Sequence, residues 1–195
     1  MKIILASKSG VRKKILDEHK IEHEVYPSNV DEDQVKDSLI SEGATPLLIS
    51  KNLAELKAKK ISARFPDKLV LGADSVISLN NELINKPISR SEAFLILKKL
   101  NNTSHSLISS VCICKNGSMM WHYTDESKLK MKNLNESQLK EYLNRISDDI
   151  LFAYGVYQIE AEGLSLFESI SGDKDSIMGL PIKQIINYIK QFKND

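Results

Sequence analysis

Asp74 stands in the middle of the most apolar stretch of the chain, Leu69 to Leu79 (LVLGADSVISL). A carboxylate among apolar neighbours is costly unless it is paired, hydrogen-bonded or bound to a metal. The two residues before it, Gly72 and Ala73, are small enough to let another chain segment or a ligand approach closely. Two interpretations follow. Asp74 either caps a bend at a strand end, or it is a metal ligand or general base on a rigid strand.

A second group of candidate residues lies in the polar loop Ser7 to Arg12 (SKSGVR), between an apolar run and a helix-like segment. Backbone N–H groups at a helix N-terminus favour anions. The hydroxyls of Ser7 and Ser9 and the guanidinium of Arg12 add donors that suit phosphate oxygens. The alternative is a serine-rich turn that only caps a helix. The chain has no G-x-x-x-x-G-K-[ST] motif, so this is not a Walker loop.

Three carboxylates follow one another at Asp31, Glu32 and Asp33, in a segment that we expect to be a loop. Loop carboxylates are usually just solvated. They could also supply an oxygen ligand for Mg²⁺, which typically takes one or two carboxylates together with substrate phosphates.

Two lysines and a further acidic pair are weaker signals. Lys57 lies in the helix-like segment AELKAKK, and Lys86 precedes Pro87 after a turn. Most lysines in such places are surface residues. Glu160 and Glu162 lie in a predicted strand and turn, where they point either at a ligand or at water.

The elements that must carry these residues can be predicted from apolar periodicity and turn chemistry. Asn116-Gly117 predicts a hairpin between two long strands. The expected strands are 3–6, 22–26, 69–79, a short one ending at 84, 104–114, 119–132, 156–160 and 164–169. The expected helices are 12–19, 45–63, one that starts after Ser89 and reaches Leu100, 135–146 and 182–189.

Two helices carry recognisable start signals. Thr45 is a candidate N-cap with Pro46 in the first turn, and Ser89 with Glu92 has the spacing of a capping box. The helix that begins near Thr45 should bury Ile49, Leu53 and Leu56. Because hairpins interrupt the alternation of helices and strands, we expect an α/β fold with a mixed sheet and flanking helices. No linker is evident, so one domain over residues 1–195 is expected.

Composition limits the class of protein. The 27 Lys and Arg residues offset 26 Asp and Glu, which leaves a net charge of +1. No global field therefore draws the chain to nucleic acid or a membrane, and neither is expected as a partner. The N-terminus resembles neither a signal peptide nor a membrane span. Cys112 and Cys114 are too few for a disulfide framework, so we expect free thiols in a strand and a cytoplasmic location.

Taken in order, the candidate segments resemble the Maf family of nucleoside triphosphate pyrophosphatases. The resemblance extends from Leu5 to about Ile189. The segments that show it are LASKSGVRKKIL, VDED, AELKAK, VLGADSVISL, INKP, the stretch from His105 to Val111, YQIEAEG and SIMGLPI.

The resemblance implies a Maf/inosine-triphosphatase-like fold, with two lobes around a cleft, and hydrolysis of a nucleoside triphosphate to the monophosphate and pyrophosphate. It implies catalytic roles for Glu32, Lys57, Asp74 and Lys86, and substrate contacts for Ser7, Ser9, Arg12, Gln158 and Glu160. Asp74 would accept the proton, and Glu32 and Asp74 would bind a divalent cation, Mg²⁺ or Mn²⁺. A homodimer is also implied.

The chain departs from the family pattern in the phosphate loop. The family reads Ser-Pro-Arg-Arg, whereas this chain has Gly10 and Val11 before Arg12. The segment EGLSLFESISG resembles the branch that acts on 7-methyl-GTP, and the pyrimidine branch has glutamine in place of Glu160. Three hypotheses stay open: a pyrophosphatase, a nucleotide-binding regulator without catalysis, and an interaction protein of septum formation or cell-division arrest.

Overall fold

The computed structural model describes residues 2–159 and 161–193. Its strands are β1 (Ile3–Leu5), β2 (His23–Val25), β3 (Val70–Leu79), β4 (Glu82–Ile84), β5 (Ser104–Lys115), β6 (Ser118–Met131) and β7 (Phe167–Ser171). Its helices are α1 (Gly10–Glu18), α2 (Glu32–Ser41), α3 (Pro46–Ser62), α4 (Arg90–Leu100), α5 (Glu136–Asn144), α6 (Asp148–Tyr154), α7 (Lys174–Ile177) and α8 (Ile182–Ile189). Short 3₁₀ turns follow at Glu162–Leu166 and Lys190–Lys193.

The described strands form one seven-stranded sheet in the order β2-β1-β3-β5-β6-β7, with β4 beside β3. β1 is parallel to both β2 and β3, while β3, β4, β5, β6 and β7 meet in antiparallel pairs. The sheet is therefore mixed, as predicted. Asn80 and Asn81 turn the chain from β3 into β4, and Asn116 and Gly117 turn it from β5 into β6, all four with positive φ.

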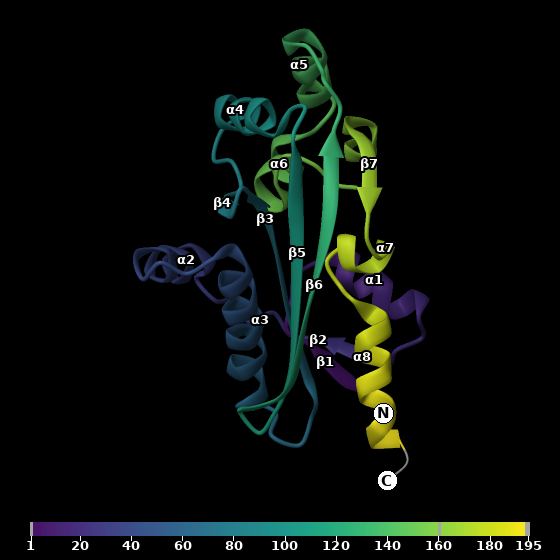
Figure 1. The fold of residues 1–195 in the computed structure, drawn as a ribbon. Helices are drawn as coiled ribbons and strands as arrows, with labels where there is room; N and C mark the ends of the chain where they lie inside the picture. Colours follow the sequence, from purple (N-terminus) through teal and green to yellow (C-terminus); the bar gives the residue numbers. More distant parts are fainter. Residues whose placement is uncertain (1, 160, 194–195) are drawn as a thin grey trace.

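The molecule has two lobes that share the long strands β3, β5 and β6 (Figure 1). The lower lobe holds β1 and β2, and its main core packs α1 and α8 against one face of the sheet. The upper lobe packs α4, α5 and α6 around a second core that includes Leu97, Leu129, Tyr142 and Leu151. The two cores meet along β3, where Leu71 and Ala73 belong to the lower one and Leu79 to the upper one.

Side chains of β3 alternate between two faces, as in any strand. Leu71 and Ala73 pack in the core with α1 and α8, whereas Gly72 lies against α3 on the other face. A Cβ at Gly72 would lie 2.2 Å from the carbonyl oxygen of Ala54, so only glycine lets α3 come this close. This close approach places the middle of α3 directly over Asp74.

Most expected elements are confirmed, often to within a residue or two. Thr45 caps α3 by accepting from the backbone N–H of Leu48, and the 116–117 hairpin forms. Ser89 caps α4, but Glu92 accepts from the backbone N–H of Ile88 rather than from Ser89.

Other sequence predictions are wrong. The acidic segment is no loop, because Asp31 caps α2 and Glu32 lies in its first turn. The expected strand at 156–160 does not form over 156–159, and α6 and α7 were not predicted. Leu56 is 38% exposed, because α3 instead turns Ile49, Leu53, Lys57 and Ile61 toward the sheet.

Candidate functional site

A cleft of about 450 Å³ opens where the two lobes meet. Its walls come from the loop before α1, the first turns of α2, the middle of α3 and β3, the segment after β4, and the segment 153–159. The sequence-predicted residues that line it are Ser7, Ser9, Arg12, Glu32, Lys57, Asp74, Lys86 and Gln158. Glu160 lies outside the described residues. The fold thus brings together side chains that are up to 151 positions apart.

Lys57 holds two carboxylates together at the centre of the cleft. Its Nζ lies 2.7 Å from Oδ1 of Asp74 and 2.8 Å from Oε1 of Glu32. Lys57 is 5% exposed and Asp74 is 4% exposed, so this is a buried ionic group. Lys57 occupies a core position of α3, four residues after Leu53 and four before Ile61. That spacing was a signal in the sequence, because a lysine on an apolar helix stripe needs a buried partner.

The other oxygen of Asp74, Oδ2, is buried and has no hydrogen-bond partner among the described residues. A buried carboxylate oxygen without a partner is costly. Its backbone is fixed by contrast, since Ser50 Oγ donates to the carbonyl of Asp74 at 3.2 Å. A rigidly held carboxylate with one oxygen free is suited to accept a proton or to bind a cation.

The loop before α1 is organised by its two serines. Ser9 caps α1 by accepting from the backbone N–H of Arg12 at 3.3 Å. Ser7 Oγ in turn accepts from the backbone N–H of Ser9 at 3.2 Å. The N-terminus of α1 therefore opens into the cleft with its hydroxyls in place, an arrangement that favours anions.

Arg12 is less available to a ligand than the sequence suggested. Its Nη1 donates to Ala73 O at 3.0 Å and to Ser7 Oγ at 3.3 Å, and its Nε donates to Gly179 O at 2.9 Å. Its Nη2 donates to Ser75 Oγ at 3.2 Å. Since a guanidinium has five N–H groups, these four bonds to described residues leave one for a ligand.

Arg12 links three segments of the chain through hydrogen bonds. It joins α1 to β3 and to the turn before α8, where Gly179 has φ +96°. Burial lowers the pKa of Arg12 from its ordinary value, and the charges of Asp74 and Glu32 oppose that effect. Sequence reasoning could not find this role, because two of the acceptors are backbone carbonyls with no sequence signature.

Glu32 is held in its charged form. Burial alone would raise the pKa of its carboxyl, but the charges of Lys57, Lys86 and Lys36 outweigh burial and lower it. Asp33, by contrast, has a side chain that is 94% exposed, and Asp31 is used to cap α2. Of the three acidic residues, Glu32 is the one that faces the cleft.

Lys86 lies at the mouth of the cleft, where its side chain is exposed on one side. The protein around its ammonium group lowers the pKa of Lys86, the nearby charges of Lys36 and Lys57 act in the same direction, and Glu32 and Asp74 oppose them. Lys36, which the sequence analysis did not single out, also lines the cleft.

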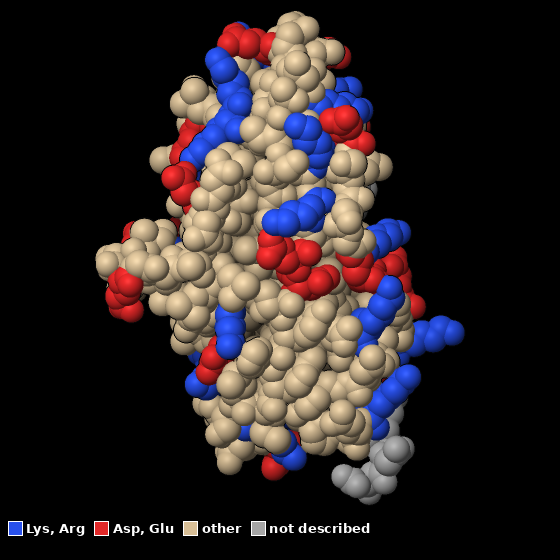
Figure 2. Space-filling view, viewed as in Figure 1, with Lys and Arg blue, Asp and Glu red and all other residues tan. Residues whose placement is uncertain are grey.

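Charges in the cleft are strongly biased toward the positive sign. The cations that line its described part are Lys8, Arg12, Lys36, Lys57 and Lys86, and the carboxylates are Glu32 and Asp74. Five minus two gives an excess of three positive charges. The visible outer surface, by contrast, has both signs interspersed (Figure 2). A polyanion is therefore the ligand that the cleft suits best.

The upper-lobe side of the cleft is more apolar. Leu83, Leu107, Tyr157 and Ile159 lie there, with Gln158 between two of them in sequence. An apolar wall with one amide suits a flat heterocyclic ring. The cleft thus joins a charged part to an apolar part.

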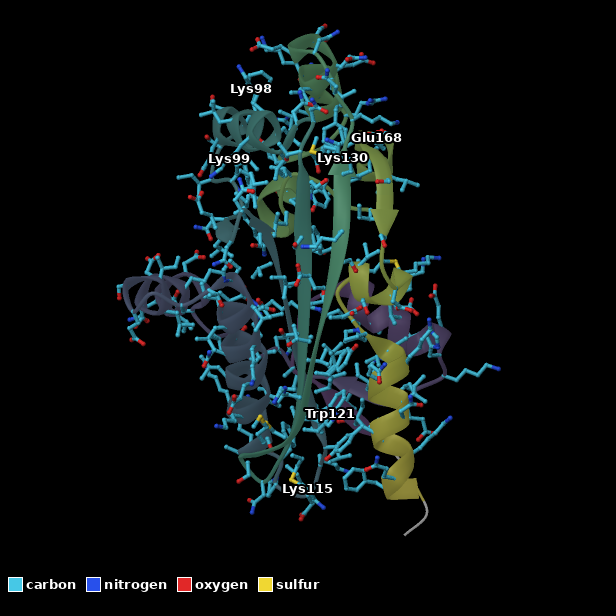
Figure 3. All side chains as sticks on the ribbon, viewed as in Figure 1. Lys98, Lys99, Lys115, Trp121, Lys130 and Glu168 are labelled. Atoms are coloured by element: carbon cyan, nitrogen blue, oxygen red, sulfur yellow. The ribbon has the colours of Figure 1, made fainter. Side chains whose placement is uncertain are left out.

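Trp121 and the two cysteines lie outside the cleft. Trp121 sits low on β6, toward α8 (Figure 3), stacked on Tyr188 at 5.0 Å between ring centroids. Cys112 and Cys114 are free and buried, and their sulfurs lie 3.6 Å apart against α3. The expectation of free thiols in a strand is confirmed.

The described residues fit a divalent cation in one specific way. No group of three or more His, Cys, Asp or Glu side chains converges within residues 2–159 and 161–193. Asp74 Oδ2 and the Glu32 carboxylate supply two oxygen donors. Mg²⁺ commonly uses one or two carboxylates and takes its other ligands from phosphates and water, so this donor set suits a cation that arrives with a phosphate ligand. In the same part of the chain, no helix is long and apolar enough to cross a membrane.

A mixed α/β fold with a cationic cleft built around a lysine and two carboxylates defines a class of phosphate-handling proteins, and comparison with known sequences gives the family. The family described as Maf-like protein matches residues 2–192, so the chain belongs to the Maf family.

Relatives match over nearly their whole length. A protein of Pelagibacter ubique (strain HTCC1062) named nucleoside triphosphate pyrophosphatase is 60% identical over 191 residues, 98% of each chain. A protein of Rhizobium etli named 7-methyl-GTP pyrophosphatase is 34% identical over 190 residues, 97% of this chain and 96% of the relative. Among solved structures, a HAM1 protein from Coxiella burnetii aligns with TM-score 0.45 and 16% identity, over 67% of this chain and 73% of that one.

Proposed function

We propose that this protein hydrolyses a nucleoside triphosphate between its α- and β-phosphates, giving the monophosphate and pyrophosphate. The observation that carries the proposal is the unpartnered Oδ2 of Asp74 in a cleft with three excess positive charges. A triphosphate would offset those charges, and a carboxylate oxygen is a base for water. The names of the relatives agree with this reaction.

In the proposed reaction, a water oxygen attacks the α-phosphorus while the bond from that phosphorus to the bridging oxygen of the β-phosphate breaks. Asp74 accepts one proton of the water on Oδ2, because Oδ1 is engaged by Lys57. Oδ2 has two lone pairs, so one can take the proton while the other would face a cation. Pyrophosphate leaves with the electron pair of the broken bond. Lys57 and Lys86 offset the charge that grows on it, which lowers the barrier.

Glu32 and Asp74 would hold the divalent cation, Mg²⁺ or Mn²⁺. When bound, such an ion polarises phosphate oxygens and offsets their charge. The protein would orient both carboxylates and keep Glu32 ionised. Lys57 and its neighbours do this for Glu32 by lowering the pKa of its carboxyl.

The substrate base is proposed to lie against the apolar upper-lobe side, near Leu107, Tyr157 and Gln158. One relative named for 7-methyl-GTP supports that nucleotide as a first choice of substrate. Ser7, Ser9 and the remaining N–H group of Arg12 would bind phosphate oxygens. The roles of Glu160 and of a homodimer stay predictions.

The test is pyrophosphate release from a panel of nucleotides. The purified protein is incubated with Mg²⁺ or Mn²⁺ and with 7-methyl-GTP, GTP, dTTP, UTP or CTP, and the products are separated. Monophosphate and pyrophosphate in equal amounts are expected from at least one of them. An Asp74→Asn protein purified in parallel controls for contaminating phosphatases.

Two results would speak against the proposal. Release of inorganic phosphate with a diphosphate product would place the cleavage at the γ-phosphate. Tight nucleotide binding without any pyrophosphate release would favour a nucleotide-binding regulator. The Gly10 and Val11 departures and the occupied donors of Arg12 would then explain why catalysis is absent.

A further inference from the structure

We propose that Lys36 binds the phosphates that leave as pyrophosphate, which makes it an additional substrate-binding residue of the cleft. The proposal rests on the proposed function for the identity of the ligand. Lys36 lies on α2, four residues after Glu32. The two side chains therefore share one face of the helix. Both line the cleft.

The side chain of Lys36 is mostly buried, although it forms few polar contacts. It is 12% exposed, and its ammonium group forms an ion pair with Asp33 at 3.8 Å. The side chain of Asp33 is 94% exposed, so water strongly weakens this ion pair. Among the described residues, no hydrogen bond engages its ammonium group at close range. A mostly buried lysine side chain whose ion-pair partner is solvated is suited to bind an anion.

The neighbours of Lys36 strengthen this reading. Its charge acts on both Glu32 and Lys86, lowering the pKa of each, so it lies near both. Glu32 is already engaged by Lys57 at 2.8 Å. Lys36 and Lys86 are therefore two like charges in one cleft, and the carboxylate near them, Glu32, is shared with Lys57. An anion between them would offset their repulsion.

The chemistry of the anion follows from the place of Lys36. The apolar side of the cleft, with Leu83, Leu107 and Tyr157, suits the base. That leaves the charged side, with Glu32, Lys36 and Lys57, for the phosphates. An ammonium group is a compact donor of three hydrogen bonds and binds phosphate oxygens well. Lys36 and Lys57, together with Lys86, place three lysines around one anion. Three positive charges match the charge of the two terminal phosphates better than that of a monophosphate.

Binding of inorganic pyrophosphate to the whole protein tests the proposal without relying on turnover. Titration calorimetry in the presence of Mg²⁺ compares the wild type with Lys36→Gln. We expect the Kd for pyrophosphate to rise by about tenfold or more, as loss of a charge-assisted hydrogen bond predicts. The Kd for GMP should change less than twofold. Lys36→Arg should restore part of the pyrophosphate affinity.

Two further variants separate binding from a structural role. Lys51→Gln removes a lysine of α3 that does not line the cleft, and it should leave pyrophosphate binding unchanged. Asp33→Asn removes the carboxylate paired with Lys36. If Lys36 acts only by fixing α2 through Asp33, this variant will lose as much affinity as Lys36→Gln, which would overturn the proposal.

Failure of this inference can be told apart from failure of the proposed function. Equal pyrophosphate affinity in the wild type and Lys36→Gln, or no binding by the wild type, refutes the role of Lys36 even if nucleotides are hydrolysed. Conversely, the wild type could bind pyrophosphate more tightly than Lys36→Gln does and yet hydrolyse no nucleotide. Lys36 then remains a binding residue. In that case it is the pyrophosphatase proposal that fails.

Discussion

Gly72 and Ala54 are in contact through backbone atoms, because α3 crosses β3 with no side chain between them. A Cβ at Gly72 would also lie 2.7 Å from the backbone nitrogen of Ala58. These are backbone atoms that cannot rotate away. The close approach of α3 sets the height of Lys57 above the sheet, and so its 2.7 Å distance to Asp74.

Replacing Gly72 with alanine should therefore damage both stability and activity. The added methyl group must push α3 away, and overpacking of this kind typically costs about 1–3 kcal/mol. Turnover should fall as Lys57 moves from Asp74. Urea unfolding measures the loss of stability. Gly10→Ala is the control, since nothing lies within 4 Å of a Cβ there, and it should unfold like the wild type. Equal stability of the two variants would contradict the argument.

Asp74→Asn tests the proposed base directly. An amide cannot take the proton of the attacking water, and loss of general-base assistance usually costs about 100-fold or more in rate. Lys57 keeps Glu32 as a partner in this variant, so the protein should fold. Pyrophosphate release and circular dichroism are measured on the same sample. Near-normal turnover in a folded Asp74→Asn protein would rule out Asp74 as the base.

Lys86→Ala should separate catalysis from stability. The described residues give the Lys86 ammonium no ion pair or hydrogen bond, and its side chain is exposed at the mouth of the cleft. The Tm should therefore stay nearly unchanged, while turnover falls by about tenfold or more because a charge near the leaving group is lost. A large drop in Tm would show instead that Lys86 is structural.

The same lysine predicts an alkaline limit of activity. Because the protein around its ammonium group lowers the pKa of Lys86, the lysine loses its charge at a pH below the ordinary value of 10.5. Turnover of the wild type should fall in that range. In Lys86→Ala, this alkaline decline should be absent, which a pH profile of both proteins checks.

Much of the fold could be predicted because local chemistry and tertiary packing agree. The apolar run around Asp74, the Asn116-Gly117 turn and the Thr45 cap each form the structure that their residue types favour. Helix α2 escaped prediction for the opposite reason. None of its residues is buried, so it shows no apolar stripe, and its cap Asp31 looked like one more loop carboxylate.

The site could be predicted only as separate parts. Asp74 was conspicuous as a charge in an apolar strand, and it does lie in the cleft. The partners that Arg12 finds are 61 and 167 positions away and include backbone carbonyls, so no spacing rule reveals them. Nothing in the sequence distinguishes Lys36 from a surface lysine, because its enclosure depends on how α2 meets the cleft.

His105 provides a prediction about acid stability in the upper lobe. It is 2% exposed, and its Nε2 lies 2.8 Å from the hydroxyl of Tyr157, which lines the cleft. Its Nδ1 is buried and has no partner among the described residues. Burial lowers the pKa of His105 from 6.5 to about 4. The folded protein thus keeps the imidazole neutral at a pH where the unfolded chain would already bind a proton.

The sign follows from proton binding. Between pH 6.5 and about 4 the unfolded state binds more protons at this position than the folded state. The contribution of His105 to the free energy of unfolding is therefore fully present above pH 6.5 and is lost as pH falls through that window. The loss should be about 3 kcal/mol. Urea unfolding at pH 7, 5.5 and 4.5 should show a steeper decline for the wild type than for His105→Gln, which has no imidazole to protonate. His122→Gln, at an exposed histidine, should decline like the wild type. Parallel pH profiles for the wild type and His105→Gln would mean that burial of His105 does not control acid unfolding.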